Sequence, residues 1–215
     1  MNQDGSMHAL IIGSGEDVPA QLPSIAAERV TVICADGGAS LARLWGVRPL
    51  IIIGDQDSLD EETKQYWEVH NVVFEQVPTN KDQTDLELAV EYALQLGVDS
   101  VTLVGAWGSR LDHSLGNLEI LYRLAKQGVV NQLLTQSYRF TAFTRTYQEQ
   151  VREGSIVSLI PLSPMVHVVG TSGLGYPLER KDLSKGNTLT ISNVAQSSLI
   201  SVQIGSGVLL AITEQ

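Results

Sequence analysis

The chain has 215 residues, 43 % hydrophobic and 18 % charged, which is ordinary for a globular protein of one large or two small domains. Twenty-four acidic against fourteen basic residues give a net charge of −10, which argues against a broad nucleic-acid surface, because such a surface needs a basic stripe. No apolar run approaches the ~20 residues that span a bilayer, and the start MNQDGSM lacks the basic and apolar regions of a secretory signal.

The cysteine content limits the disulfide bonds that the chain can form. Cys34 is the single cysteine, so the chain forms no internal disulfide. A reducing cytoplasm fits this composition, and we expect neither a nucleic acid nor a membrane as partner.

Up to about residue 135, short β-branched runs alternate with helical patterns. This alternation predicts parallel strands in an α/β domain, which we place at residues 1–137. The expected strands are 8–12, 30–34, 50–53, 72–77, 100–104 and 130–135.

The clearest helix is predicted over residues 84–97. Thr84 with Glu87 three residues later forms a capping-box pattern, and Gly97 supplies a stop. A second helix is expected over 112–126. The apolar residues of the first helix share one face: Leu86, Ala89, Val90, Ala93 and Leu94.

After residue 137 the helical period disappears. Strand-length segments at 155–162, 187–192 and 198–204 are punctuated by Gly, Ser, Pro and Asn. Two apolar runs flank Gly205–Gly207, which suggests a hairpin. We expect a small antiparallel β-sandwich over residues 138–215.

Polar clusters follow the strands of the first half. Because ligands bind outside the carboxyl ends of parallel strands, these clusters are expected to converge on one rim. They comprise Asp36; Asp55 and Asp57; Lys81, Asp82 and Asp85; and Arg110, Asp112 and His113.

Taken singly, each cluster has a structural explanation. Asp36 or Asp57 could cap a turn or helix, Asp85 could favour a helix dipole, and Arg110 with Asp112 could form a surface pair.

Together the aspartates indicate a bound cation. Oxygen ligands with few histidines favour Mg²⁺ over zinc, and Lys81 and Arg110 on the same rim indicate a polyphosphate. The sequence contains no P-loop. The GSGE segment at 13–16 is read first as a turn and second as a phosphate contact, and Gly105 and Gly108 are expected to let the backbone approach the ligand.

The segments ADGGA, GDQDS, KDQTD and GSRLDH, in this order, resemble the thiamine pyrophosphokinase (thiamine diphosphokinase) family. The likeness continues into GLGYPL and GNTLTISN. It implies transfer of a pyrophosphoryl group from ATP to the hydroxyl of thiamine, releasing AMP, by a homodimer whose thiamine site lies between subunits.

The resemblance also implies residue roles. Residues 1–137 would be the ATP-binding catalytic domain and 138–215 the thiamine-binding domain. Its motifs assign catalysis to Asp36, Asp57, Asp82 and Asp85; Mg²⁺ binding to Asp55, Asp57 and Asp85; ATP binding to Lys81, Arg110, Asp112 and His113; and thiamine binding to Asp85, Ser192 and Asn193.

One position departs from the family pattern. Family members often carry an aromatic residue two positions after the Ser-Asn pair, where this chain has Ala195. If that aromatic ring packs on thiamine, Ala195→Phe is expected to tighten thiamine binding.

Three alternative functions remain open at this stage. They are a Mg²⁺-dependent phosphohydrolase, a pyrophosphokinase for another alcohol such as a pterin, and a non-catalytic nucleotide or vitamin sensor.

Overall fold

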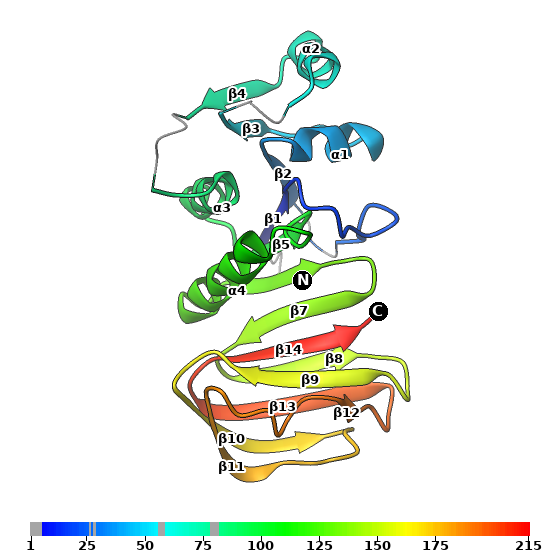
Figure 1. The fold of residues 1–215 in the computed structure, drawn as a ribbon, viewed down its shortest axis with the longest axis vertical. Coiled ribbons are helices and arrows are strands. Elements are labelled where there is room, and N and C mark those ends of the chain that lie inside the picture. Colours follow the sequence, from blue (N-terminus) through cyan, green and yellow to red (C-terminus); the bar gives the residue numbers. More distant parts are fainter. Residues whose placement is uncertain (1–5, 26, 28, 56–58, 78–81) are drawn as a thin grey trace, which may run out of the picture. The chain divides into compact units, whose positions relative to one another are not determined.

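A computed structural model describes residues 6–25, 27, 29–55, 59–77 and 82–215. The chain divides into two compact units, Met1–Leu118 and Glu119–Gln215. Figure 1 labels their helices and strands. The predicted division at residue 137 stays a prediction.

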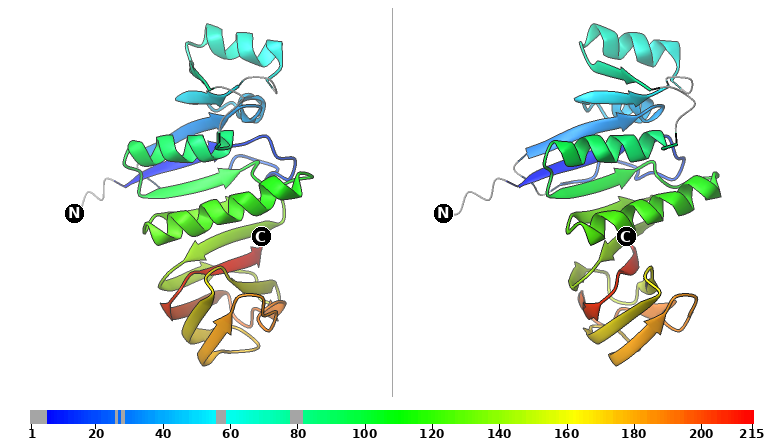
Figure 2. Two further views of the ribbon diagram at one scale, coloured as in Figure 1. Left: turned by 60° about the vertical axis from the view of Figure 1, so that its left-hand side comes forward. Right: turned by 90° about the vertical axis from the view of Figure 1, so that its left-hand side faces the viewer.

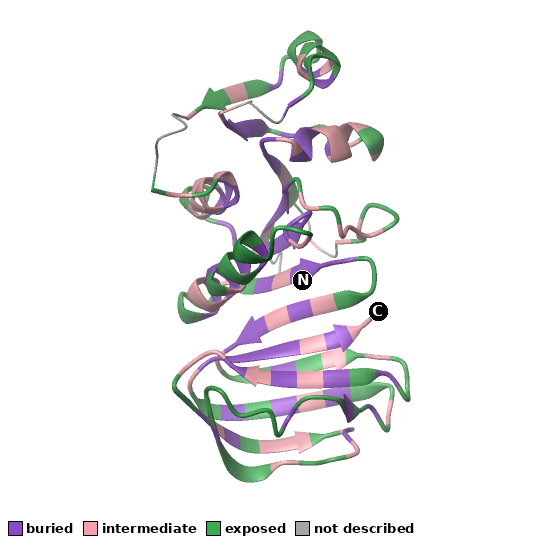
Figure 3. Ribbon diagram, in the orientation of Figure 1, coloured by how far each residue is buried: buried purple, intermediate pink, exposed green. Residues whose placement is uncertain are grey.

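The first unit contains a parallel sheet with strand order β5-β1-β2-β3-β4. Its strands run as expected from the β-branched runs, and most of their side chains are buried in β1, β3 and β5 (Figure 3). The strands are β1 (Met7–Ile12), β2 (Arg29–Ala35), β3 (Ile51–Gly54), β4 (Val73–Gln76) and β5 (Ser100–Val104).

Helices cover both faces of this sheet. Figures 1 and 2 show α3 (Asp85–Gln95) on one face and α1 (Gly38–Leu44) on the other. The cap of α3 is the predicted one, since the Thr84 side chain accepts a hydrogen bond from the Glu87 amide at 3.2 Å. The helix α2 (Glu61–Val69) is capped by Asp60, and α4 (Leu111–Lys126) carries the chain into the second unit.

The second unit is antiparallel. One set of strands runs in the order β12-β9-β14-β7-β6, and the other is a four-stranded sheet in the order β11-β10-β13-β8. The strands are β6 (Val130–Leu134), β7 (Tyr138–Phe143), β8 (Thr146–Gln150), β9 (Ile156–Pro161), β10 (Met165–Ser172), β11 (Glu179–Ser184), β12 (Asn193–Val194), β13 (Leu199–Ser206) and β14 (Leu209–Glu214).

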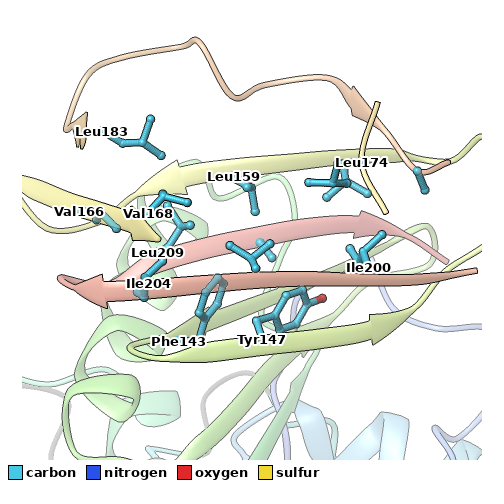
Figure 4. Close-up of a cluster of buried hydrophobic side chains, with 14 residues drawn as sticks. Phe143, Tyr147, Leu159, Val166, Val168, Leu174, Leu183, Ile200, Ile204 and Leu209 are labelled. Atoms are coloured by element: carbon cyan, nitrogen blue, oxygen red, sulfur yellow. The ribbon is translucent and has the colours of Figure 1, made fainter. Parts of the chain in front are cut away.

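A hydrophobic core lies between these two sheets. Buried residues alternate with more exposed ones along β9 and β13, as expected for strands with one face on a core (Figure 3). Figure 4 shows side chains from both sheets, including Leu159, Val166 and Ile204, pointing into this cluster. The second unit is therefore a β-sandwich, and the predicted fold class is confirmed for both halves.

Two local predictions for the second unit are wrong. Residues 187–192 form turns rather than a strand, and the apolar side chains Leu189 and Ile191 are 60 % and 46 % exposed. The segment 205–207 does not close a hairpin, because β13 pairs with β8 and β10 whereas β14 pairs with β7 and β9. The glycines instead let the chain cross from one sheet to the other.

None of the helices in the described ranges combines the length and the hydropathy that crossing a bilayer requires.

Candidate functional site

A cleft of ≈ 580 Å³ opens at the carboxyl edge of the parallel sheet in the first unit. Its walls come from the loops after β1, β2, β3 and β5 and from the first turns of α3 and α4. The lining comprises residues 13–16, 35–36, 55, 83–86, 105–110, 113, 114 and 117. This is the edge at which open α/β sheets bind ligands.

The loops after β1 and β5 are joined backbone to backbone along one wall. The amides of Gly13, Gly15 and Asp17 donate to the carbonyls of Val104, Gly105 and Trp107 at 2.8, 2.7 and 3.1 Å. These bonds continue the pairing of the two strands beyond their ends.

The glycines of this wall are required by that close approach. Gly105 has φ +60°, and a Cβ added to it would lie 2.2 Å from the Gly13 carbonyl oxygen. A Cβ at Gly108 would likewise lie 2.9 Å from the Glu16 amide nitrogen. Both glycines also line the cleft, so their expected approach to a ligand stays a prediction, while their close contacts in the structure are with the neighbouring loop.

Asp36 occupies the turn that follows β2. Its φ of +47° lies in the left-handed region, which is uncommon for a non-glycine residue, and its side chain is 7 % exposed. The N-cap of α1 is Gly37, and no side-chain hydrogen bond caps this helix. Asp36 is therefore not the cap. Gly54 leaves room for it, because a Cβ there would lie 2.9 Å from the Asp36 Cβ.

Asp55 and Asp85 line the same cleft as Asp36. Asp55 is half-buried and comes directly after β3, whereas Asp85 is the first residue of α3. The positive end of the helix dipole favours a carboxylate at that position. The structure therefore brings together three aspartates that are far apart in the sequence.

Arg110 and His113 line the cleft as well, whereas Asp112 lies outside the lining. Nε and an Nη of Arg110 donate to the two carboxylate oxygens of Asp112 at 3.2 and 2.7 Å, and both side chains are about two-thirds exposed. Hydrogen bonding from Arg110 lowers the pKa of Asp112 to about 2, and the same bond raises the pKa of Arg110. The surface-pair interpretation thus describes Asp112 well, while Arg110 also faces the cleft.

Two buried polar residues of α4 support the loop after β5 that lines the cleft, and the sequence analysis did not predict them. The Ser114 hydroxyl accepts from the Gly108 amide at 3.2 Å and lies 3.1 Å from the Arg110 carbonyl, and Asn117 donates to the Ala106 carbonyl at 2.7 Å. Their spacing of three residues on a helix that starts at the cleft was the available signal.

Several predicted residues lie elsewhere. Asp82 is exposed and is not part of the lining, and Asp57 and Lys81 lie outside the described residues. Ser192 and Asn193 belong to the second unit, where Asn193 is buried and Ser192 has φ +60°.

The chemistry of the cleft carboxylates fits a hard cation. Asp36, Asp55 and Asp85 offer oxygen atoms only, which suits Mg²⁺. Among the described residues no three His, Cys, Asp or Glu side chains are grouped closely enough to hold a metal ion by themselves.

These features define a two-unit α/β protein with a ligand cleft of the open-sheet type and an antiparallel sandwich. Comparisons with known proteins narrow this class. Residues 22–132 match the family model described as thiamin pyrophosphokinase, catalytic domain, and residues 145–209 match thiamin pyrophosphokinase, vitamin B1 binding domain. The chain belongs to the thiamin pyrophosphokinase family, whose members are transferases.

Individual relatives extend the likeness over nearly the whole chain. The thiamine pyrophosphokinase of Bacillus subtilis is 29 % identical over 205 residues, with 94 % of this chain and 96 % of the relative covered. A crystal structure of the enzyme from that species has a TM-score of 0.87 at 27 % identity, covering 98 % of this chain and 99 % of the other. The structure from Geobacillus thermodenitrificans gives 0.83 at 28 % identity, with 97 % of each chain covered.

Proposed function

We propose that the protein transfers a pyrophosphoryl group from ATP to the hydroxyl of thiamine, giving thiamine diphosphate and AMP with the help of Mg²⁺. The observation that carries this proposal is the single cleft that gathers Asp36, Asp55, Asp85 and Arg110 at the carboxyl edge of the sheet. Phosphoryl-type transfer needs positioning and charge neutralisation more than covalent participation by the protein.

The basic groups would bind the phosphates of ATP. The Arg110 fork already holds two carboxylate oxygens of Asp112 at 3.2 and 2.7 Å, and a phosphate presents oxygens to the same planar fork. Lys81 would add a point charge, and His113 lines the cleft beside Arg110. Asp112 would hold the Arg110 fork in place until a phosphate of the nucleotide replaces it.

Asp36, Asp55, Asp57 and Asp85 are the proposed carboxylates of the phosphate site, with Asp55, Asp57 and Asp85 as metal ligands. When bound there, Mg²⁺ supplies charge neutralisation on the transferring and leaving phosphate oxygens. Asp85 is our choice for the group that orients the thiamine hydroxyl or accepts its proton, because it is half-buried in the cleft at the start of α3. Asp82, three residues earlier, has a supporting part in the same loop.

The thiamine end of the substrate would be bound by the second unit, through the region of Ser192 and Asn193. The vitamin B1 binding model covers both residues. We further propose that the protein is a cytoplasmic homodimer; light scattering of the purified protein tests the dimer, and cell fractionation tests the location.

The decisive assay incubates the protein with ATP and MgCl₂, with and without thiamine, and measures AMP and thiamine diphosphate. Thiamine-dependent AMP formation is expected, together with its loss on chelation of the metal. Phosphate release that is indifferent to thiamine would instead indicate a phosphohydrolase. AMP formation with a pterin or another alcohol, but not with thiamine, would reassign the acceptor.

A further inference from the structure

We infer that Trp107 stacks on the base of the donor nucleotide and thereby favours purine over pyrimidine nucleoside triphosphates. This inference rests on the proposed function, because it assigns the nucleoside end of the substrate whose phosphates Arg110 would bind. Trp107 follows β5, lines the cleft and lies three residues before Arg110 in the same loop. Arg110 and the carboxylates account for the phosphate end, and the base needs a contact of its own.

Trp107 is the aromatic side chain that the cleft offers to a flat ligand. It is half-buried, and among the described residues that line the cleft no other is Phe, Tyr or Trp. The residues outside the described ranges include no Phe, Tyr or Trp either. A base that enters this cleft therefore meets the Trp107 indole as its candidate stacking partner.

The other two tryptophans have structural positions. Trp67 in α2 is 2 % exposed, and its indole Nε1 donates to the Ala39 carbonyl at 3.0 Å. Trp45 is half-buried as the C-cap residue of α1. Neither of them lines the cleft. Trp67 thus serves the core and Trp45 a helix end, whereas Trp107 belongs to a loop of the ligand cleft.

The backbone around Trp107 is anchored at three consecutive residues. The preceding carbonyl, that of Ala106, accepts from the Asn117 side chain at 2.7 Å. The Trp107 carbonyl accepts from the Asp17 amide at 3.1 Å, and the following amide donates to the Ser114 hydroxyl at 3.2 Å. A ring carried by a backbone that is fixed in this way requires little loop ordering when a base stacks on it.

The chemistry of the donor suits an indole. Every nucleobase has a π face, and stacking on an aromatic side chain binds it without reading its hydrogen-bonding edge. A purine has two fused rings, which give it a larger contact with an indole than the single ring of a pyrimidine. A stacking contact therefore predicts a preference by ring size.

The acceptor is the less suitable partner for this ring. The family model for vitamin B1 binding covers residues 145–209, whereas Trp107 lies in the 22–132 match to the catalytic domain. Under the proposed function thiamine would be bound by the second unit, and Trp107 belongs to the loop that leads to Arg110. We therefore assign Trp107 to the nucleotide.

Titration calorimetry with MgCl₂ and without thiamine tests this assignment with two probes, ATP and inorganic tripolyphosphate. Trp107→Ala should raise the Kd for ATP about ten-fold and leave the Kd for tripolyphosphate within about two-fold, because only ATP carries a base. Trp107→Phe keeps an aromatic face and should recover most of the ATP affinity. Trp45→Ala is the matched control, since Trp45 is also half-buried in the first unit but lies outside the lining, and it should bind ATP like the wild type.

The failure of this inference can be told from the failure of the proposed function. An unchanged ATP affinity in Trp107→Ala would remove the base contact, and equal weakening of ATP and tripolyphosphate would show that the ring only shapes the cleft. A wild type that binds both probes as expected but forms no thiamine diphosphate would overturn the proposed function alone. Absence of ATP binding by the wild type would contradict both.

The base preference gives a second readout. The wild type should bind GTP about three-fold or more tighter than CTP, and Trp107→Ala should bring the ratio of the two Kd values close to one. Equal ratios in the two proteins would contradict stacking on this ring. In steady-state assays the KM for thiamine should not change in Trp107→Ala, and a raised thiamine KM with unchanged ATP affinity would reassign the ring to the acceptor.

Discussion

The α/β unit and the β-sandwich position their polar and aromatic side chains in different ways. In the α/β unit, parallel strands end at one edge, so Asp36, Asp55 and Asp85 reach one cleft although they are far apart in the sequence. In the sandwich, the exposed ring of Tyr176 is placed by a short contact between residues 173–176 and 193–196. The first arrangement follows from strand order, whereas the second depends on a local pairing.

This difference matters for how mutations should act. In the α/β unit a change of charge at the cleft should impair activity without affecting the fold, because the cleft residues lie beyond the ends of the strands. In the sandwich, the paired segments 173–176 and 193–196 contain the core residues Leu174 and Ala195, so substitutions there are expected to affect stability as well. Four predictions test this comparison.

The largest expected effect is that of Asp85→Asn. Removing the charge should lower the rate of thiamine-dependent AMP formation about 100-fold or more, because the role proposed for this carboxylate is to orient or deprotonate the acceptor hydroxyl. Circular dichroism should remain that of the wild type. Glu87→Gln, in the same helical turn but outside the cleft lining, is the control and should retain activity. Full activity of Asp85→Asn would remove this residue from the mechanism.

Gly105→Ala tests whether the loop pairing maintains the cleft. The new Cβ would lie 2.2 Å from the Gly13 carbonyl oxygen at a φ of +60°, so a loss of about 3 kcal/mol in the free energy of unfolding is expected. Gly116→Ala is the matched control. Nothing lies within 4 Å of a Cβ at Gly116, inside α4, and alanine there should stabilise the protein by about 0.5–1 kcal/mol. Urea denaturation measures the free energy of unfolding of both variants. Equal values for Gly105→Ala and Gly116→Ala would contradict the expected difference.

Ala195→Phe is now expected to destabilise the sandwich rather than to tighten thiamine binding. The side chain at this position is 2 % exposed in a packed core, and overpacking costs about 1–3 kcal/mol. The midpoint of thermal unfolding should fall. Val194→Phe, at the more exposed neighbouring position, should be tolerated. Tighter thiamine binding by a stable Ala195→Phe variant would refute this placement.

The smallest expected effect concerns pH and His8, which lies in the α/β unit away from the cleft lining. His8 is 7 % exposed, and its ring nitrogens lie 2.7 Å from the Ser100 hydroxyl and 2.9 Å from the Thr102 hydroxyl. Desolvation lowers the pKa of His8 below 6.5, so the unfolded chain binds a proton more readily than the folded protein. Stability contributed by the neutral ring is therefore full above pH 6.5 and is lost as the pH falls below that value.

Denaturation midpoints at pH 7.5 and pH 5 measure this effect. His8→Gln should lose less stability on acidification than the wild type does. An identical pH dependence of stability in wild type and His8→Gln would exclude His8 as a source of the acid sensitivity.

The sequence predicts the α/β unit well because its signals are local and repeated. The capping pattern of Thr84 and Glu87, the strand that precedes Asp55 and the turn after β2 all lie where the residues indicate. Ser114 and Asn117 were not predicted because the apolar periodicity that indicates a buried helix face does not include polar residues. Both are buried under the loop to which they bond.

The sandwich is less predictable for physical reasons. Alternating Leu189 and Ile191 mimic a strand, yet both are exposed and the chain turns before Ser192. Gly205 and Gly207 resemble a hairpin turn, and only the tertiary pairing shows that β13 and β14 belong to different sheets. The backbone of Tyr176 is held by the side chain of Asn193, seventeen residues away, through hydrogen bonds that no periodicity reveals.

The fork between Arg110 and Asp112 has a consequence for how a nucleotide enters the cleft. Since the guanidinium already faces an anion, a phosphate bound there as proposed would replace the Asp112 carboxylate instead of meeting a bare cation. The displaced carboxylate remains in the first turn of α4, where the helix dipole continues to favour it. Because that carboxylate stays at the wall, binding of a phosphate would add negative charge there, and added salt should weaken the resulting repulsion.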